Sequence, residues 1–290
     1  MGKAQRTRGG RSKEPARRSV PRRFAPTFGV LGGIAVIVVF SLLQGGGGPA
    51  EPSVAPGSID LVTAVPAATL DAIGITDAVT GPVSRLPAGE PAVIADGKPV
   101  VTYIGAEFCP YCAAERWAMV VALSRFGTFS GLTPTVSGPA PEPFPETATL
   151  TFHGVSYASD YLTLSAAEYA TNVPQAGGGF TPLDELTPEQ QRLIDTYDTQ
   201  AYVGSDGGVP FVMLGNRFAW VGASFPVDTI HGLTFDEIAG RLADPEDAVA
   251  IAIGGAANRI TAMLCELTGD EPGDVCTGPG VLAAKATLPA

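Results

Sequence analysis

Residues 98–127, KPVVTYIGAEFCPYCAAERWAMVVALSRFG, constrain the fold of this 290-residue chain more than any other stretch. A short apolar run rich in β-branched residues and ended by Gly105 predicts a buried strand over 98–105. From Pro110 to about Phe126 the pattern predicts a helix. Seven consecutive apolar residues, Trp117 to Leu123, indicate that this helix is buried on most of its circumference.

Further strands and helices alternate along the chain. Candidate strands lie at residues 147–155 and 159–166, and the segment 208–222, GVPFVMLGNRFAWVG, predicts two strands around a Gly215-Asn216 turn. A short helix is expected within residues 66–74. Capping patterns predict three more helices that begin at Thr187, at Thr234 and at Asp244-Pro245, the last continuing to about Leu267. This order of elements predicts a mixed α/β fold.

The charge of the chain is divided unevenly. Residues 1–23 hold 9 of the 18 basic residues and one acidic residue, a net charge of +8. The remaining 9 basic and 28 acidic residues leave −19 on the rest of the chain. A body this acidic repels nucleic acid and anionic lipid, so we expect no nucleic-acid partner.

An uncharged run follows the basic head and predicts a membrane anchor. The run from Phe24 to Ala50 is long enough for a helix across a bilayer, which we place at residues 24–46. The positive-inside rule makes residues 1–23 a cytoplasmic tail and puts the domain outside the cell membrane, which the chain spans once. A cleaved signal peptide is the alternative, and it exports the body equally. We expect residues 47–90 to be a linker and pre-domain segment, and residues 91–290 to be the extracytoplasmic domain.

Cys109 and Cys112 are two of four cysteines, and their C-x-x-C spacing suits a redox pair, a metal site or the core. A structural zinc site is disfavoured because Cys265, Cys276 and the two histidines have no ligand-like spacing. We therefore expect no metal and favour a redox pair.

The chemistry of a helix start assigns the two sulfurs different roles. If Cys109 is the N-cap and Pro110 the first helical residue, the amide of Cys112 points at the Cys109 sulfur. That bond and the helix dipole lower the pKa of Cys109, which makes it the attacking thiolate. Cys112, one turn into the helix, is placed to resolve the mixed disulfide.

Two motifs now carry a resemblance. GAEFCPYCAAE after a buried strand, and GVPFVML before a turn and a second strand, resemble the two halves of a thioredoxin-superfamily active site. Over about residues 95–268 the chain is most similar to bacterial membrane-anchored thioredoxin-like (DsbA-like) proteins. The resemblance implies a thioredoxin-like α/β fold with an insertion at about 130–200, between the active-site helix and the strand of Pro210. It also implies a cis Pro210 that faces the cysteines. A cis Val209-Pro210 bond would leave the Val209 backbone free to pair with an extended client segment. We expect no organic cofactor.

Two residues near the cysteines have supporting roles in this interpretation. Glu107 either shuttles a proton or simply ends a strand. Tyr111 stands where strongly oxidising relatives have histidine, which argues against a strong oxidase. Trp117 is expected in the core and His231 on the surface.

The resulting functional hypothesis is a thiol–disulfide oxidoreductase that reduces or isomerises exported cysteine-containing proteins. Its membrane electron donor or acceptor is not specified by the sequence. The alternative is a thioredoxin-like binding or scaffolding module in which the pair is a structural disulfide. An exposed Cys109 beside Pro210 favours the enzyme, and burial of Cys109 by the insertion favours the module. Cys265 and Cys276, at the end of the last long helix, are expected to form a structural disulfide, with a second redox pair as the rival hypothesis.

Overall fold

The computed structural model describes residues 52–290. The predicted tail at residues 1–23 and the predicted transmembrane helix at 24–46 lie outside the described residues.

A mixed β-sheet forms the centre of the described chain. Its middle strand, β3 (Lys98–Gly105), pairs antiparallel with β11 (Phe211–Leu214) and parallel with β8 (Thr163–Glu168). Beyond β11 follow β12 (Phe218–Val221) and β1 (Ser84–Arg85), and β2 (Ile94–Ala95) pairs with the start of β3. The predicted strand at 98–105, the hairpin at 208–222 and the mixed α/β class are confirmed.

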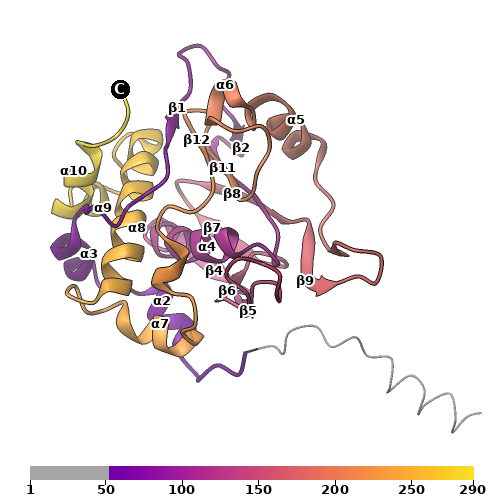
Figure 1. Cartoon of the computed structure of the whole chain (residues 1–290). Coiled ribbons are helices and arrows are strands. Elements are labelled where there is room, and N and C mark those ends of the chain that lie inside the picture. Colours follow the sequence, from indigo (N-terminus) through magenta and orange to yellow (C-terminus); the bar gives the residue numbers. More distant parts are fainter. Residues whose placement is uncertain (1–51) are drawn as a thin grey trace, which may run out of the picture. The chain divides into compact units, whose positions relative to one another are not determined.

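Helices cover both faces of this sheet (Figure 1). The two long helices α4 (Pro110–Leu123) and α8 (Ala248–Thr268) pack on one face, and α5 (Pro188–Tyr197) and α6 (Gln200–Val203) pack on the other. A hydrophobic core lies on each face of the sheet. The side chains of β11 contribute to both cores in turn, because successive side chains of a strand point to opposite faces. Val212 and Leu214 contribute to the core under α4, whereas Phe211 and Met213 contribute to the core under α5.

Three two-stranded sheets elaborate this architecture. Two of them, β4 (Gly127–Ser130) with β7 (Ser156–Ser159) and β5 (Thr133–Val136) with β6 (Ala148–Thr151), lie between α4 and β8 in the chain. The third, β9 (Ala170–Pro174) with β10 (Phe180–Pro182), follows β8. The insertion predicted at about 130–200 therefore also contains β8, a strand of the main sheet, and α5, a helix that covers it. The strands outside the main sheet lie in two separate segments, residues 127–159 (β4 to β7) and residues 170–182 (β9 and β10).

The structured part begins earlier than the domain boundary at residue 91 predicts. Helices α2 (Ser58–Thr63) and α3 (Ala67–Ile73) bury Val62 and Leu70 in the main core. The Ser58 hydroxyl donates a 2.6 Å hydrogen bond to Asp236, and β1 adds a strand to the sheet. Apolar side chains at helical spacing explain why this segment packs rather than acting as a tether.

The C-terminal part is helical. After the 3₁₀ turn η1 (Val227–Thr229) come α7 (Phe235–Arg241), α8, α9 (Gly273–Cys276) and α10 (Pro279–Lys285). Capping boxes confirm the predicted helix starts at Thr187 and Thr234. The start predicted at Asp244-Pro245 is wrong. Asp247 caps α8 by accepting a 2.8 Å bond from the Val249 amide, while Asp244 accepts from the Glu246 amide in the preceding turn.

Helix α8 is the one helix within residues 52–290 whose length and hydropathy would let it cross a membrane. Most of its side chains are buried in the core against α4 and α10. Its apolar character is accounted for by this packing.

Candidate functional site

Cys109 caps the amino-terminal end of α4. Its backbone is extended, Pro110 occupies the first helical position, and its Sγ accepts a 3.3 Å hydrogen bond from the Cys112 amide. Proline at this position loses no helical hydrogen bond, since the first amides of a helix have no partner inside it. The sequence Cys-Pro-Tyr-Cys therefore places the Cys109 sulfur at the positive end of the helix dipole and the Cys112 sulfur one helical turn further along.

The two thiols titrate in opposite directions. The pKa of Cys109 is lowered, first by the hydrogen bond with the Cys112 thiol, then by the Cys112 amide and by the positive charge of Arg116, against an opposing effect of burial. Burial raises the pKa of Cys112 well above its ordinary value, and the hydrogen bond to Cys109 raises it further. The geometry thus supports one thiolate nucleophile and one protonated partner, and both are free cysteines.

The start of β11 lies against Cys109. Its thiol is 3.6 Å from the carbonyl oxygen of Val209, and the Val209–Pro210 peptide bond is cis. The register of β11 with β3 pairs Phe211 with Ile104, so Val209-Pro210 and the end of β3 that leads to Cys109 share one edge of the sheet. The structure thus brings together Cys109, Cys112, Val209 and Pro210.

The other predicted residues differ in their access to solvent. Tyr111 is 42 % exposed, whereas Cys109 is only 5 % exposed and Cys112 is fully buried. Glu107 is half-buried, and its backbone amide donates a 2.9 Å bond to the Ala170 carbonyl at the start of β9. Trp117 is buried in the core and His231 is exposed, as predicted.

A buried ion pair lies one helical turn below Cys112. Arg116 Nη1 is 2.9 Å from Glu168 Oε1, and neither side chain is exposed to solvent. The same nitrogen donates to the Tyr103 hydroxyl at 3.2 Å. Burial raises the pKa of Glu168 to about 7, although Arg116 opposes this shift. The pair therefore places a cation and a titratable carboxyl beneath the cysteines.

Sequence reasoning did not select Arg116 or Glu168. A signal was present for Arg116, because it follows Cys112 by four residues on the same face of a helix in which Glu115 is the only other charged residue. A charged residue in such a helix needs a buried partner. Glu168 offered no comparable signal, since its side chain reaches the pair only through the parallel pairing of β8 with β3.

Aromatic side chains from the β4–β7 and β9–β10 segments contact two residues next to the cysteines. Phe108 stacks on Phe180 of β10 with ring centroids 4.2 Å apart, and Tyr111 meets Phe144 edge to face at 6.3 Å. The loop between β5 and β6, residues 138–146, contains four prolines and is called the proline-rich loop. The Gly138 amide donates a 2.7 Å bond to the Phe108 carbonyl, which fixes this loop to the residue before Cys109.

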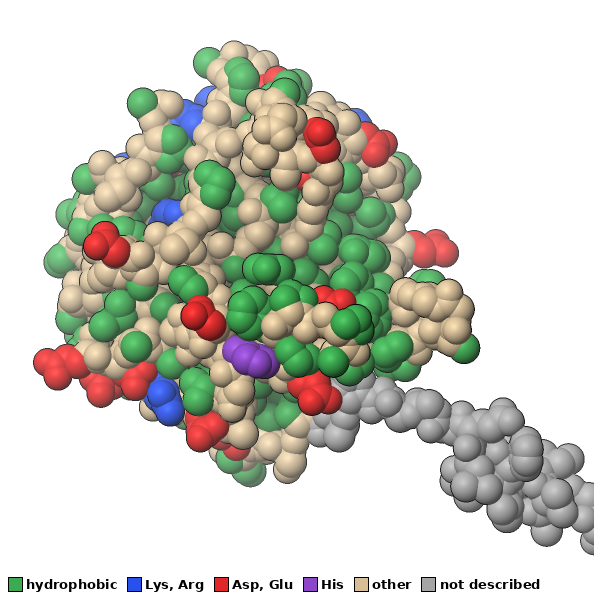
Figure 2. Space-filling model, viewed as in Figure 1, with side chains coloured by type: hydrophobic (Ala, Val, Ile, Leu, Met, Phe, Trp, Pro, Cys, Tyr) green, Lys and Arg blue, Asp and Glu red, His purple; other side chains and the backbone are tan. Residues whose placement is uncertain are grey.

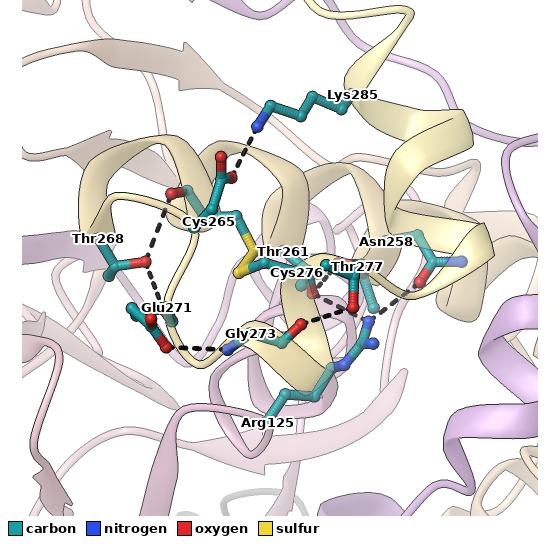
Figure 3. The surroundings of a disulfide bond; sticks show 12 residues. Arg125, Asn258, Thr261, Cys265, Thr268, Glu271, Gly273, Cys276, Thr277 and Lys285 are labelled. Carbon is teal, nitrogen blue, oxygen red and sulfur yellow. Dashed lines mark hydrogen bonds and ion pairs between the residues drawn. A yellow bond between two sulfur atoms is a disulfide. The ribbon is translucent and has the colours of Figure 1, made fainter.

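The second cysteine pair lies elsewhere. Cys265 at the end of α8 and Cys276 of α9 form a buried disulfide with Cα atoms 5.6 Å apart (Figure 3). Arg125, which follows α4, donates to Asn258 and Thr261 beside this bond. The disulfide is therefore near the carboxyl-terminal end of α4, about 20 Å along the helix from Cys109 at 1.5 Å per residue.

The part of the chain from residue 52 onward contains no group of three or more His, Cys, Asp or Glu side chains that could hold a metal ion.

Fold and site together define a mixed α/β protein with a C-x-x-C pair at the start of a buried helix. The chain belongs to the family described as a domain of unknown function (DUF929), whose model matches residues 90–266. No curated protein and no solved structure matches the chain.

Proposed function

We propose that this protein is a thioredoxin-like thiol–disulfide oxidoreductase that acts through Cys109 and Cys112. The observation that carries the proposal is the hydrogen bond from the Cys112 amide to the Cys109 sulfur at a helix start. An amide and a helix dipole aimed at a sulfur stabilise the thiolate, which is the attacking species in disulfide exchange. The Val209 carbonyl oxygen lies 3.6 Å from the Cys109 sulfur, so the backbone before Pro210 is next to the nucleophile.

The reaction proceeds in two exchanges. The Cys109 thiolate attacks one sulfur of a client disulfide, forms a mixed disulfide and releases the other client sulfur as a thiolate, which takes up a proton. Cys112 then loses its proton and attacks the Cys109 sulfur, which releases the second client thiol and leaves a Cys109–Cys112 disulfide. Two electrons pass from the protein to the client, and the reverse sequence oxidises a client.

We place this chemistry outside the cell, on a domain held by one transmembrane segment. The basic head and the apolar run in residues 1–50 support this location. Exported cysteine-containing proteins are the proposed clients, and a membrane donor or acceptor of electrons would regenerate the pair.

The low exposure of Cys109 favours a second candidate function. A sulfur in a residue only 5 % exposed is poorly accessible, which suits a binding or scaffolding module that carries out no exchange. The two candidates differ in one property, the ability of Cys109 to form a covalent bond with a client.

Trapping tests this property directly. In the full-length Cys112→Ala variant in detergent, an exchange enzyme forms a mixed disulfide at Cys109 with a peptide disulfide, because no resolving thiol remains. Mass spectrometry of the peptide that contains Cys109 detects the adduct. The matched control, Cys109→Ser with Cys112→Ala, forms none. A folded Cys112→Ala protein that forms no adduct would support the scaffolding module instead.

A further inference from the structure

The surroundings of Cys109 combine an aromatic wall with negative charge. Two segments outside the main sheet supply the wall: the proline-rich loop supplies Phe144, and β10 supplies Phe180. Figure 2 shows hydrophobic side chains gathered beside the β9–β10 hairpin, with acidic side chains and one histidine close to them and Lys and Arg elsewhere on this face. The exposed ring of Tyr111 continues the wall from the active-site helix itself.

Three acidic residues lie in the same part of the chain as these aromatic side chains and the cysteines. Glu107 is half-buried two residues before Cys109, and the proline-rich loop carries the half-buried Glu142 and the exposed Glu146. Tyr169 lies beside Phe108, with ring centroids 6.1 Å apart. Burial is the main cause that raises the pKa of Tyr169 to about 12, and the carboxylate of Glu142 adds a smaller effect in the same direction.

Most Lys and Arg side chains of the described chain are engaged away from this surface, whereas the His231 ring lies against Phe144 with centroids 5.6 Å apart. Arg116 is buried in its pair with Glu168. Several others bond to acidic or carbonyl groups on distant elements: Arg85 to Glu266, Lys98 to the Ser159 carbonyl, Arg192 to Glu189, Arg259 to the carbonyls of Thr80 and Gly81, and Lys285 to Asp270.

We infer that the site accepts polypeptide clients whose cysteine is flanked by apolar and basic residues, and that it discriminates against glutathione. This inference rests on the proposed function and specifies its substrate class. An apolar side chain next to the client cysteine packs against Phe144 or Phe180, and a Lys or Arg is attracted by Glu142 and Glu146. Glutathione has two carboxylates and one ammonium group, hence a net negative charge that the acidic residues repel, and it has no large apolar side chain to pack against Phe144 or Phe180.

Exchange rates with matched substrates test the charge requirement. The full-length protein, reduced and in detergent, is mixed with three disulfides: a Leu- and Lys-flanked peptide, a Leu- and Glu-flanked peptide, and oxidised glutathione. At low ionic strength we expect the Lys-flanked peptide to react about tenfold faster than the other two, and salt to narrow the difference.

Reversing the charge of Glu142, beside the aromatic wall, provides the decisive comparison. Glu142→Lys should reduce the preference for the Lys-flanked peptide severalfold. Glu246→Lys makes the same change of net charge on an exposed residue before α8 and should leave the preference intact. Glu246 is exposed and Glu142 is half-buried, so both variants are expected to fold.

The aromatic wall is tested by its effect on a ratio. Phe144→Ala should lower the rate with a Phe-flanked peptide relative to a Gly-flanked peptide by about fivefold, as expected for the loss of one aromatic contact. Leu282→Ala, at an exposed position on α10, is the control and should not change the ratio.

Two outcomes would overturn the inference. Equal rates with all disulfides, or faster reaction with oxidised glutathione, would remove the client class while retaining the redox function. Reaction of Cys109 with none of these disulfides would remove the redox function together with the inference.

Discussion

The amide of Cys112 donates a 3.3 Å hydrogen bond to the sulfur of Cys109. This bond joins the first and last residues of the Cys-Pro-Tyr-Cys turn, so the same four residues that begin α4 also stabilise the thiolate. Because Cys112 is buried and Cys109 is at the helix terminus, a negative charge is favourable on one sulfur and unfavourable on the other.

We therefore expect the two cysteines to react with different pH profiles. Cys109 should be alkylated by iodoacetamide at a rate that reaches its plateau below the pH range of an ordinary thiol, because its pKa is lowered. Cys112 should resist alkylation across the same range, because burial raises its pKa. Mass spectrometry of the full-length protein quenched at successive times provides both profiles. Coincident profiles for the two thiols would contradict the assignment of roles.

The buried Arg116–Glu168 pair should affect both stability and thiol chemistry. Arg116→Met leaves the Glu168 carboxyl buried without its partner, so we expect a loss of about 3–5 kcal/mol in the free energy of unfolding. It also removes a positive charge that lowers the pKa of Cys109, so the alkylation profile should move to higher pH. Urea unfolding and alkylation measure the two effects.

The conservative variant separates charge from packing. Arg116→Lys keeps the positive charge and should restore much of the low pKa of Cys109. A folded Arg116→Met protein whose Cys109 reacts as in the wild type would show that the pair is structural alone.

Glu168 should make stability depend on pH. Its pKa rises from 4.5 to about 7 in the folded protein, so the folded state holds this proton more tightly than the unfolded chain does. The resulting stabilisation is fully present below the unfolded value and disappears as the pH rises through about 7. Glu168→Gln cannot titrate, and unfolding midpoints measured across this range should show a shallower decline than the wild type. Identical slopes would mean that Glu168 does not hold this proton.

The sequence predicts the local features of the site better than its buried charges. Neighbouring residues are enough to predict that Cys109 caps the helix, that Pro110 is the first helical residue, and that a hairpin follows Val209-Pro210. Helix caps and turns are local interactions. Glu168 is 52 residues from Arg116 in the chain, and only the pairing of β8 with β3 brings them together. The aromatic wall has the same origin: Phe144 and Phe180 lie in segments that lack the periodicity of long elements.

The packing of residues 58–85 could not be predicted from the sequence for a different reason. The residues from Ser58 to Arg85 contain helices of only six and seven residues and a two-residue strand. Elements this short have weak signals of their own, and burial of Val62 and Leu70 against distant helices stabilises them.

The disulfide of Cys265 and Cys276 should contribute to stability and not to exchange. The two residues are 11 apart in sequence, and closing such a loop stabilises by roughly 3 kcal/mol in the chain-entropy model. The variant with Cys265→Ser and Cys276→Ser should unfold at lower temperature and retain its reduction of peptide disulfides. Loss of turnover in a folded double variant would instead place this pair in the electron path.

The reduction potential of the Cys109–Cys112 pair tests the central claim most directly. The full-length protein is equilibrated in glutathione buffers of graded ratio, and the oxidised fraction of the pair is measured by mass spectrometry after acid quenching. With Tyr111 between the cysteines, we expect reversible interconversion at about −200 to −230 mV, the range of glutaredoxins, rather than near the −120 mV of DsbA. A potential of about −120 mV, as in DsbA, would contradict this expectation. A pair that neither glutathione nor dithiothreitol buffers oxidise and reduce reversibly would contradict the proposed exchange chemistry.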